Sequence, residues 1–190
     1  MIYVDNEYYH IFNRGAHKSK IFFLEENYRY CLRLLKKYSS QYSASILAYC
    51  LMPNHYHLVC QQKAGGSVSK FLQTTFNAYS QAVNKQQRHS GTLFEGKAQG
   101  KHINSDSYVL QVVRYLHLNP VEARLVIKPE DWRFSDFGDW IVEPSEGLKP
   151  SEGLLLRNAY FKDGVAYREF VETYKEEKGS AGIKNFLFDE

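Results

Sequence analysis

The strongest constraint on the fold of this 190-residue chain is the order of its periodic segments. Strand-like patterns cover residues 8–13, 45–51, 55–61 and 99–103, whereas helical spacing covers residues 25–38 and 68–87. A further helix is expected to begin near Asn104-Ser105-Asp106 and to end at Asn119-Pro120. The resulting βαββαβ order, with one added helix, predicts a ferredoxin-like α+β sandwich: an antiparallel sheet with helices on one face plus a C-terminal helix.

Composition restricts the class of protein further. Hydrophobic residues make up 44% of the chain and aromatic residues 15%, which is typical of a globular chain and not of a disordered one. There is no basic-then-apolar leader, and the longest apolar run, residues 46–52, is too short to span a bilayer, so we expect no membrane association. The three cysteines show no CxxC spacing, which favours a reduced cytoplasm over a disulfide framework.

The charge is unevenly distributed along the chain. Residues 1–128 hold 16 Lys and Arg against 7 Asp and Glu, a net charge of +9, whereas residues 129–190 hold 8 against 14, a net charge of −6. Such asymmetry predicts a basic body that binds a polyanion and carries an acidic tail. A basic body neutralised by its own tail is the alternative.

The chain after residue 140 has a weaker pattern. The segment Pro144-Ser145-Glu146-Gly147-Leu148 recurs as Pro150-Ser151-Glu152-Gly153-Leu154, and we interpret this short repeat as a linker. The spacing of Tyr167, Phe170, Val171 and Tyr174 predicts one short amphipathic helix docked on the body. We therefore expect a main domain over residues 1–140 and an acidic extension over residues 141–190.

The segment His55-Tyr56-His57 carries the clearest chemical signal. Side chains alternate between the two faces of a strand, so the two imidazoles would point the same way. Histidine is the commonest protein ligand of metal ions, and such a pair would form half of a divalent-metal site. The alternative is that both histidines are packed or surface residues and that their spacing arose by chance.

Tyr115 and Asn119 could complete such a site. They stand four residues apart, so they share one face of the last helix of the core. Two imidazoles and an amide oxygen make a neutral ligand set that suits Mg²⁺ or Mn²⁺ once a substrate phosphate adds charge. The ion would withdraw charge from a phosphodiester, and a tyrosine with a free pKa of about 10 needs such help to act as a nucleophile. A half-buried structural tyrosine is the alternative for Tyr115.

Four segments in this order resemble the IS200/IS605-like tyrosine transposase superfamily, the Y1 group of HUH enzymes, and above all its REP-associated branch. Each segment is weak alone, but the ordered combination, which covers roughly residues 3–140, is specific. The matching segments are Tyr9-His10-Ile11-Phe12-Asn13-Arg14-Gly15, Met52-Pro53-Asn54-His55-Tyr56-His57-Leu58-Val59, Gly91-Thr92-Leu93-Phe94 and Tyr115-Leu116-His117-Leu118-Asn119-Pro120-Val121-Glu122-Ala123.

The resemblance implies a role for each of these residues. His55, His57 and Asn119 would be metal ligands for Mg²⁺ or Mn²⁺, and Tyr115 would be the nucleophile. Asn119 stands where insertion-sequence relatives more often carry Gln, which favours the REP-associated branch. The implied reaction is cleavage of single-stranded, hairpin-forming DNA that leaves a 5′-phosphotyrosine and a free 3′-hydroxyl, followed by strand transfer. Residues 1–140 would be the catalytic domain of a prokaryotic, cytoplasmic enzyme.

For contacts to DNA we select four basic residues: Arg14, Arg88, Lys97 and Lys101. The segment from Phe94 to Lys101 is richer in glycine than the family pattern, and the acidic tail has no counterpart in it. His10 is interpreted as a strand packing residue. His117 lies about 200° around the helix from Tyr115 and is left out of the site.

Two alternatives to a DNA transesterase stay open. A βαββαβ plan also occurs in RNA-recognition domains that bind without catalysis, although the aromatic signature of that class is absent here. A mononuclear hydrolase would instead use the two histidines to activate water. Because related enzymes use their tyrosine within one subunit or across a homodimer, the resemblance leaves the oligomeric state open.

Overall fold

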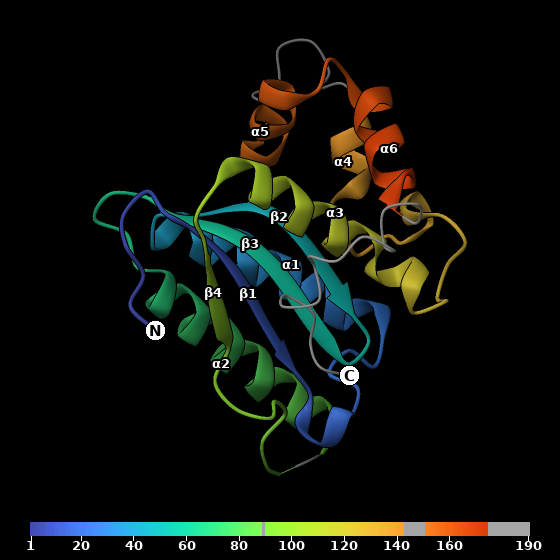
Figure 1. The fold of residues 1–190 in the computed structure, drawn as a ribbon. Coiled ribbons are helices and arrows are strands. Elements are labelled where there is room, and N and C mark those ends of the chain that lie inside the picture. The colour runs from blue at the N-terminus through green and yellow to red at the C-terminus, as the bar shows by residue number, and fades with distance from the viewer. Residues whose placement is uncertain (89, 143–150, 175–190) are drawn as a thin grey trace.

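The computed structural model describes residues 1–88, 90–142 and 151–174 and contains one four-stranded antiparallel sheet. The strand order is β2-β3-β1-β4, which is the order of a ferredoxin-like sandwich (Figure 1). This confirms the predicted fold class, and each strand begins and ends close to its expected position. The strands are β1 (Tyr8–Arg14), β2 (Ala44–Met52), β3 (His55–Gln62) and β4 (Gln99–Ile103).

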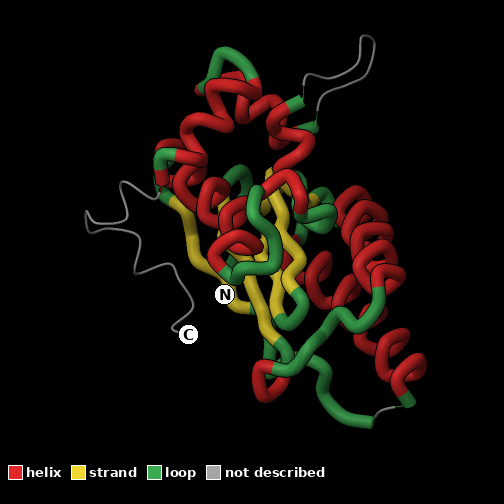
Figure 2. Tube along the Cα trace, turned by 90° about the vertical axis from the view of Figure 1, so that its right-hand side faces the viewer, coloured by secondary structure: helices red, strands yellow, loops and turns green. Residues whose placement is uncertain are grey.

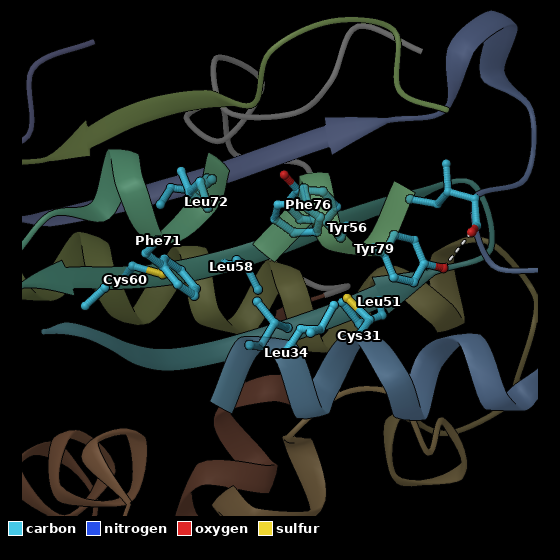
Figure 3. Close-up of a cluster of buried hydrophobic side chains, with 14 of the residues drawn as sticks. Cys31, Leu34, Leu51, Tyr56, Leu58, Cys60, Phe71, Leu72, Phe76 and Tyr79 are labelled. Atoms are coloured by element: carbon cyan, nitrogen blue, oxygen red, sulfur yellow. Dashed lines mark hydrogen bonds between the residues drawn. The ribbon is translucent and has the colours of Figure 1, made fainter. Parts of the chain in front are cut away.

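Two long helices cover one face of the sheet. They are α1 (Glu25–Gln41) and α2 (Val68–Gln87), and both match the expected segments, α1 with three more residues at its end. Figure 3 shows how their apolar side chains, among them Leu34 and Phe71, pack against Tyr56 and Leu58 of β3. The Tyr79 hydroxyl donates a hydrogen bond of 2.7 Å to the carbonyl of Ile21, which satisfies the one polar atom of that buried ring.

The opposite face of the sheet is covered by α3 (Asp106–Glu122), so the strands lie between two groups of helices (Figure 2). Its residues Val109, Val113 and Leu116 are fully buried, as their helical spacing predicted. They pack with Val59 of β3 and apolar residues of β2 in a second core cluster. The helix thereby crosses the face of the sheet on which His55 and His57 lie.

The predicted end of α3 at Asn119-Pro120 is wrong, because the helix continues through Pro120 to Glu122. Proline removes only one backbone donor, and the following turn closes normally with a 2.9 Å hydrogen bond from the Ala123 amide to the Asn119 carbonyl. The preference of a pre-proline residue for extended backbone is overridden here by burial of this turn. Asn119 is thus held inside the helix, on the same face as Tyr115.

Three further helices pack beyond α3. They are α4 (Phe137–Ile141), α5 (Glu152–Tyr160) and α6 (Gly164–Glu172), with two single 3₁₀ turns, η1 (Ala16–Lys18) and η2 (Pro129–Asp131), elsewhere. Helix α6 confirms the predicted amphipathic helix, and its Tyr167 and Val171 are fully buried. Across the described ranges, no helix is both long and apolar enough to cross a membrane.

The interpretation of the repeat as a linker is wrong for its second copy. Ser151 caps α5 by accepting a hydrogen bond from the Leu154 amide, and Glu152 to Leu154 form its first turn. Gly153 packs so closely against the backbone of Leu47 that a side chain would not fit. The first copy lies outside the described residues.

Buried polar contacts attach the C-terminal helices to α3. His117 contacts the Tyr167 hydroxyl through Nδ1 at 2.7 Å and the Asp136 carboxylate through Nε2 at 3.0 Å. The fully buried guanidinium of Arg114 lies over the ring of Phe170, 4.3 Å from its centroid. The extension therefore contributes to the packing of the helix that carries Tyr115.

Candidate functional site

The histidine pair lies at the start of β3, immediately after the tight turn at Pro53-Asn54. His55 and His57 share the α3 face of the sheet, with their ring centroids 5.0 Å apart, whereas Tyr56 between them faces α2. His57 is fully buried and His55 is half-buried. The co-facing arrangement expected from the spacing is therefore confirmed.

His55 is held between two amide side chains. Its Nδ1 lies 2.7 Å from Oδ1 of Asn54, and its Nε2 lies 3.1 Å from Oδ1 of Asn119 on α3. A neutral imidazole carries only one N–H and can donate to only one of these oxygens. In the tautomer with the proton on Nδ1, the Nε2 atom has a free lone pair toward Asn119. This tautomer can bind a metal ion through Nε2.

His57 contacts a third histidine, His10 of β1. The Nδ1 atom of His57 lies 3.0 Å from Nε2 of His10, and both rings are fully buried. Burial lowers the pKa of His57 well below its usual range, and neighbouring His55 and His10 lower it further. Burial, with a smaller contribution from Lys101, lowers the pKa of His10 to about 3. Both rings are therefore neutral, and Nε2 is the nitrogen of His57 that would bind a metal ion.

Tyr115 stands beside this pair, one helical turn before Asn119. Its ring lies edge-on to His57, with centroids 5.6 Å apart, and 6.5 Å from the ring of His10. The side chain is half-buried, so one part of it packs while another reaches the surface. The structure thus brings together all four residues selected from the sequence, from two segments some 60 positions apart.

One distance in this set of side chains is compatible with a six-coordinate divalent ion. Adjacent ligands around Mg²⁺ or Mn²⁺, at bond lengths of about 2.1 Å, are separated by about 3 Å. The 3.1 Å between Nε2 of His55 and Oδ1 of Asn119 matches that separation. In the described part of the chain, no group of three or more His, Cys, Asp or Glu side chains could hold a metal ion, so this set depends on an amide oxygen as its third donor.

Two of the four selected basic residues flank these histidines. In the sheet register Arg14 pairs with His55, and Lys101 of β4 pairs with His10, which places both on the α3 face. Arg14 forms an ion pair with Glu95 that raises its own pKa and lowers that of the carboxylate. The ammonium of Lys101 lies over the ring of Phe12, 5.7 Å from the centroid.

The other two basic residues lie elsewhere. Arg88 follows the last residue of α2 and adopts a left-handed conformation, with φ of 52°, that ends the helix. Lys97 is exposed in the segment between α2 and β4, beside a groove on the α2 side. Neither contacts the histidines.

His10 is the residue that sequence reasoning underrated. It packs inside the sheet as expected, but it also contacts the buried nitrogen of His57. The contact follows from the register of the sheet, in which Phe12, two residues after His10, pairs with His57. His117, by contrast, points into the C-terminal helices, which confirms that it lies away from Tyr115.

Comparison with known proteins gives a consistent result. Residues 3–122 match the family model described as "Transposase IS200 like". The solved structure of a REP-associated tyrosine transposase bound to a REP hairpin superposes with a TM-score of 0.64 at 15% identity, covering 80% of this chain and 94% of that one. A Deinococcus radiodurans R1 protein assigned as a transposase superposes with a TM-score of 0.44 at 16% identity, covering 60% and 92%. No curated protein matches significantly.

Proposed function

Since this chain belongs to the IS200-like transposase family, we propose that it cleaves and rejoins single-stranded DNA through Tyr115. The observation that carries the proposal is the position of the Tyr115 ring 5.6 Å from His57, beside the pair formed by His55 and Asn119. The proposed nucleophile and the proposed metal ligands come from two distant segments and lie together on one side of the sheet.

In the proposed reaction, the Tyr115 oxygen forms a bond to the phosphorus of a DNA phosphodiester, and the bond from that phosphorus to the 3′-oxygen breaks. The product is a 5′-phosphotyrosine and a 3′-hydroxyl, so the energy of the broken bond is kept for strand transfer. The phenolic proton lost by Tyr115 is balanced by protonation of the leaving 3′-oxygen.

His55, His57 and Asn119 would hold a Mg²⁺ or Mn²⁺ ion in this reaction. Such an ion acts as a Lewis acid that withdraws charge from the scissile phosphate when it is bound. Asn54 and His10 would orient the two imidazoles through their Nδ1 atoms, as outer partners of metal-binding histidines do. Because the imidazoles are neutral, the net charge of the occupied site would be the sum of the charges of the ion and the phosphate.

We further propose hairpin-forming DNA as the substrate, a preference supported by the structural likeness to the transposase bound to a REP hairpin. Arg14 and Lys101, which flank the histidines, would contact the DNA backbone; Arg88 and Lys97 would contact more distant parts of the strand. Residues 1–140 would form the catalytic domain and residues 141–190 an extension of it, and the enzyme would act in the prokaryotic cytoplasm. A homodimer is one arrangement that would let Tyr115 act across subunits.

The experiment is a denaturing gel of the full chain mixed with Mn²⁺ or Mg²⁺ and a hairpin oligonucleotide. The label is on the DNA fragment that keeps the 5′-phosphate and would stay attached to the protein. The proposal predicts a covalent protein–DNA adduct that forms in wild type and is absent in Tyr115→Phe and in His57→Ala. Tyr108→Phe is a matched control on the same helix and should leave the adduct intact.

Each alternative has its own outcome in this gel. Cleavage that survives Tyr115→Phe would support the hydrolase, in which water attacks the phosphate. DNA binding with no cleavage by either metal ion would support a non-catalytic binding module.

A further inference from the structure

The flank of α3 that points away from the proposed site carries a fully buried histidine. His117 comes two residues after Tyr115 and two before Asn119, and it lies about 200° around the helix from the tyrosine. Burying a polar ring is costly unless its nitrogens find hydrogen-bond partners. The proposed cleavage reaction uses neither ring nitrogen, so His117 must serve the helix in another way.

Both ring nitrogens of His117 contact residues that follow α3 in the chain. Nε2 lies 3.0 Å from Oδ1 of Asp136, and Nδ1 lies 2.7 Å from the hydroxyl of Tyr167 on α6. A carboxylate accepts and does not donate, so Nε2 carries the proton and donates to Asp136, and Nδ1 accepts from the Tyr167 hydroxyl. The two contacts thus fix the tautomer of the ring and the direction of each hydrogen bond.

Asp136 connects this network to the sheet. Its Oδ1 atom also accepts a hydrogen bond of 2.8 Å from the amide of Tyr49 on β2, and its own amide donates to the Tyr49 carbonyl. Its Oδ2 atom accepts a hydrogen bond of 3.1 Å from the indole of Trp140 on α4. Because β2 is the neighbour of β3 in the sheet, His117 is held against the same rigid frame that carries the histidine pair.

Arg114 holds the same flank of α3. It precedes His117 by three residues, and its fully buried guanidinium lies over the ring of Phe170 on α6, 4.3 Å from the centroid. Tyr115 lies on the other flank, with its ring edge-on to His57. Contacts on the buried flank therefore set the rotation at which α3 presents Tyr115 to the histidines.

Small rotations of a helix matter at the tip of a long side chain. Side chains reach about 5–6 Å from the helix axis, so a rotation of about 10° moves such a tip by about 1 Å. A misplacement of about 1 Å can slow a reaction that depends on orientation roughly 100-fold. We propose that His117 is a positioning residue that fixes the rotation of α3 and thereby holds the Tyr115 oxygen where the reaction needs it, an inference that rests on the proposed function.

The test compares Tyr167→Phe with Tyr79→Phe in the full chain. Each variant removes one buried hydroxyl that makes a contact of 2.7 Å, but Tyr79 bonds to the Ile21 carbonyl on the opposite side of the sheet (Figure 3). We expect both variants to lose a similar free energy of unfolding, so Tyr79→Phe is a control for stability. His117→Gln, which can satisfy only one of its two partners at a time, serves as a second variant of the network.

Two measurements report on position. With 3-fluorotyrosine in place of Tyr115, the fluorine resonance should shift or broaden in Tyr167→Phe and in His117→Gln and stay as in wild type in Tyr79→Phe. The rate of adduct formation with saturating hairpin DNA and Mn²⁺ should fall about tenfold or more in the first two variants and stay unchanged in Tyr79→Phe. The affinity for DNA in EDTA should be the same in all of them, because the network lies away from the DNA.

The readouts separate this inference from the proposed function. If Tyr167→Phe keeps the wild-type rate, or if Tyr79→Phe slows adduct formation equally, His117 contributes only to stability and the inference is overturned. If wild type forms no adduct, the proposed function is wrong, and the fluorine resonance still tests whether His117 fixes the rotation of α3. A resonance that is identical in wild type, Tyr167→Phe and His117→Gln would overturn the inference in either case.

Discussion

Nε2 of His55 lies 3.1 Å from Oδ1 of Asn119, across 64 positions of sequence. This contact joins the start of β3 to the last turns of α3, the helix that carries Tyr115. In the proposed metal site, both atoms would bind the same cation.

Removal of the amide should therefore weaken metal binding. We expect Asn119→Ala to lower Mn²⁺ affinity at least tenfold, because one of three protein donors is lost, and to lower the rate of adduct formation. The measurement is titration with Mn²⁺ followed by electron paramagnetic resonance. Asn84→Ala, far along α2, is the control, and equal Mn²⁺ affinity in Asn119→Ala and wild type would contradict the assignment.

His10 should act through His57. We expect His10→Ala to lower Mn²⁺ affinity about 10- to 100-fold, the usual effect of removing an outer partner of a metal-binding histidine, while the fold is retained. His10→Gln should restore part of the affinity, because an amide can still accept a hydrogen bond from Nδ1 of His57. The exposed His102→Ala is the control. If His10→Ala binds Mn²⁺ as wild type does, His10 only packs.

The C-terminal helices should stabilise the whole domain. Tyr167→Phe removes the hydroxyl that contacts buried Nδ1 of His117, so we expect the free energy of unfolding to fall by about 1–3 kcal/mol. Tyr160→Phe removes an exposed hydrogen bond to Asp106 and should change it by no more than about 0.5 kcal/mol. Urea unfolding followed by circular dichroism measures both. Equal stability of the two variants would mean that the contact between Tyr167 and His117 does not stabilise the fold.

Lys101 should contribute charge to DNA binding. We expect Lys101→Gln to weaken binding of a single-stranded oligonucleotide and to reduce the slope of log affinity against log salt concentration by about 0.7, the value for one lost phosphate contact on a single strand. Lys36→Gln, on α1 at the opposite edge of the sheet, is the control. A slope that is identical in Lys101→Gln and wild type would show that Lys101 makes no phosphate contact.

The sequence predicted most of the fold because its elements carry strong local signals. The alternation around His55 and the helical spacing in α2 and α3 predict elements that the structure contains with nearly the same bounds. These two patterns were enough to predict that His55 and His57 share one face of a strand and that Tyr115 and Asn119 share one face of a helix. The predictions from local pattern were wrong where tertiary packing determines the secondary structure. Burial carries α3 through Pro120, and contact with β2 turns the repeat at Ser151 into a helix.

The role of His10 could not be predicted for a related reason. Its contact with His57 depends on the register between β1 and β3, which pairs Phe12 with His57, and a single sequence does not reveal that register.

The most direct test of the account is to locate the covalent bond itself. Wild type would be incubated with Mn²⁺ and a hairpin oligonucleotide, digested with a protease and a nuclease, and analysed by tandem mass spectrometry. The account predicts a nucleotide joined through its 5′-phosphate to Tyr115, together with a released strand whose 3′-hydroxyl a polymerase can extend. Cleaved DNA with no modified peptide, or a nucleotide on any residue other than Tyr115, would contradict it.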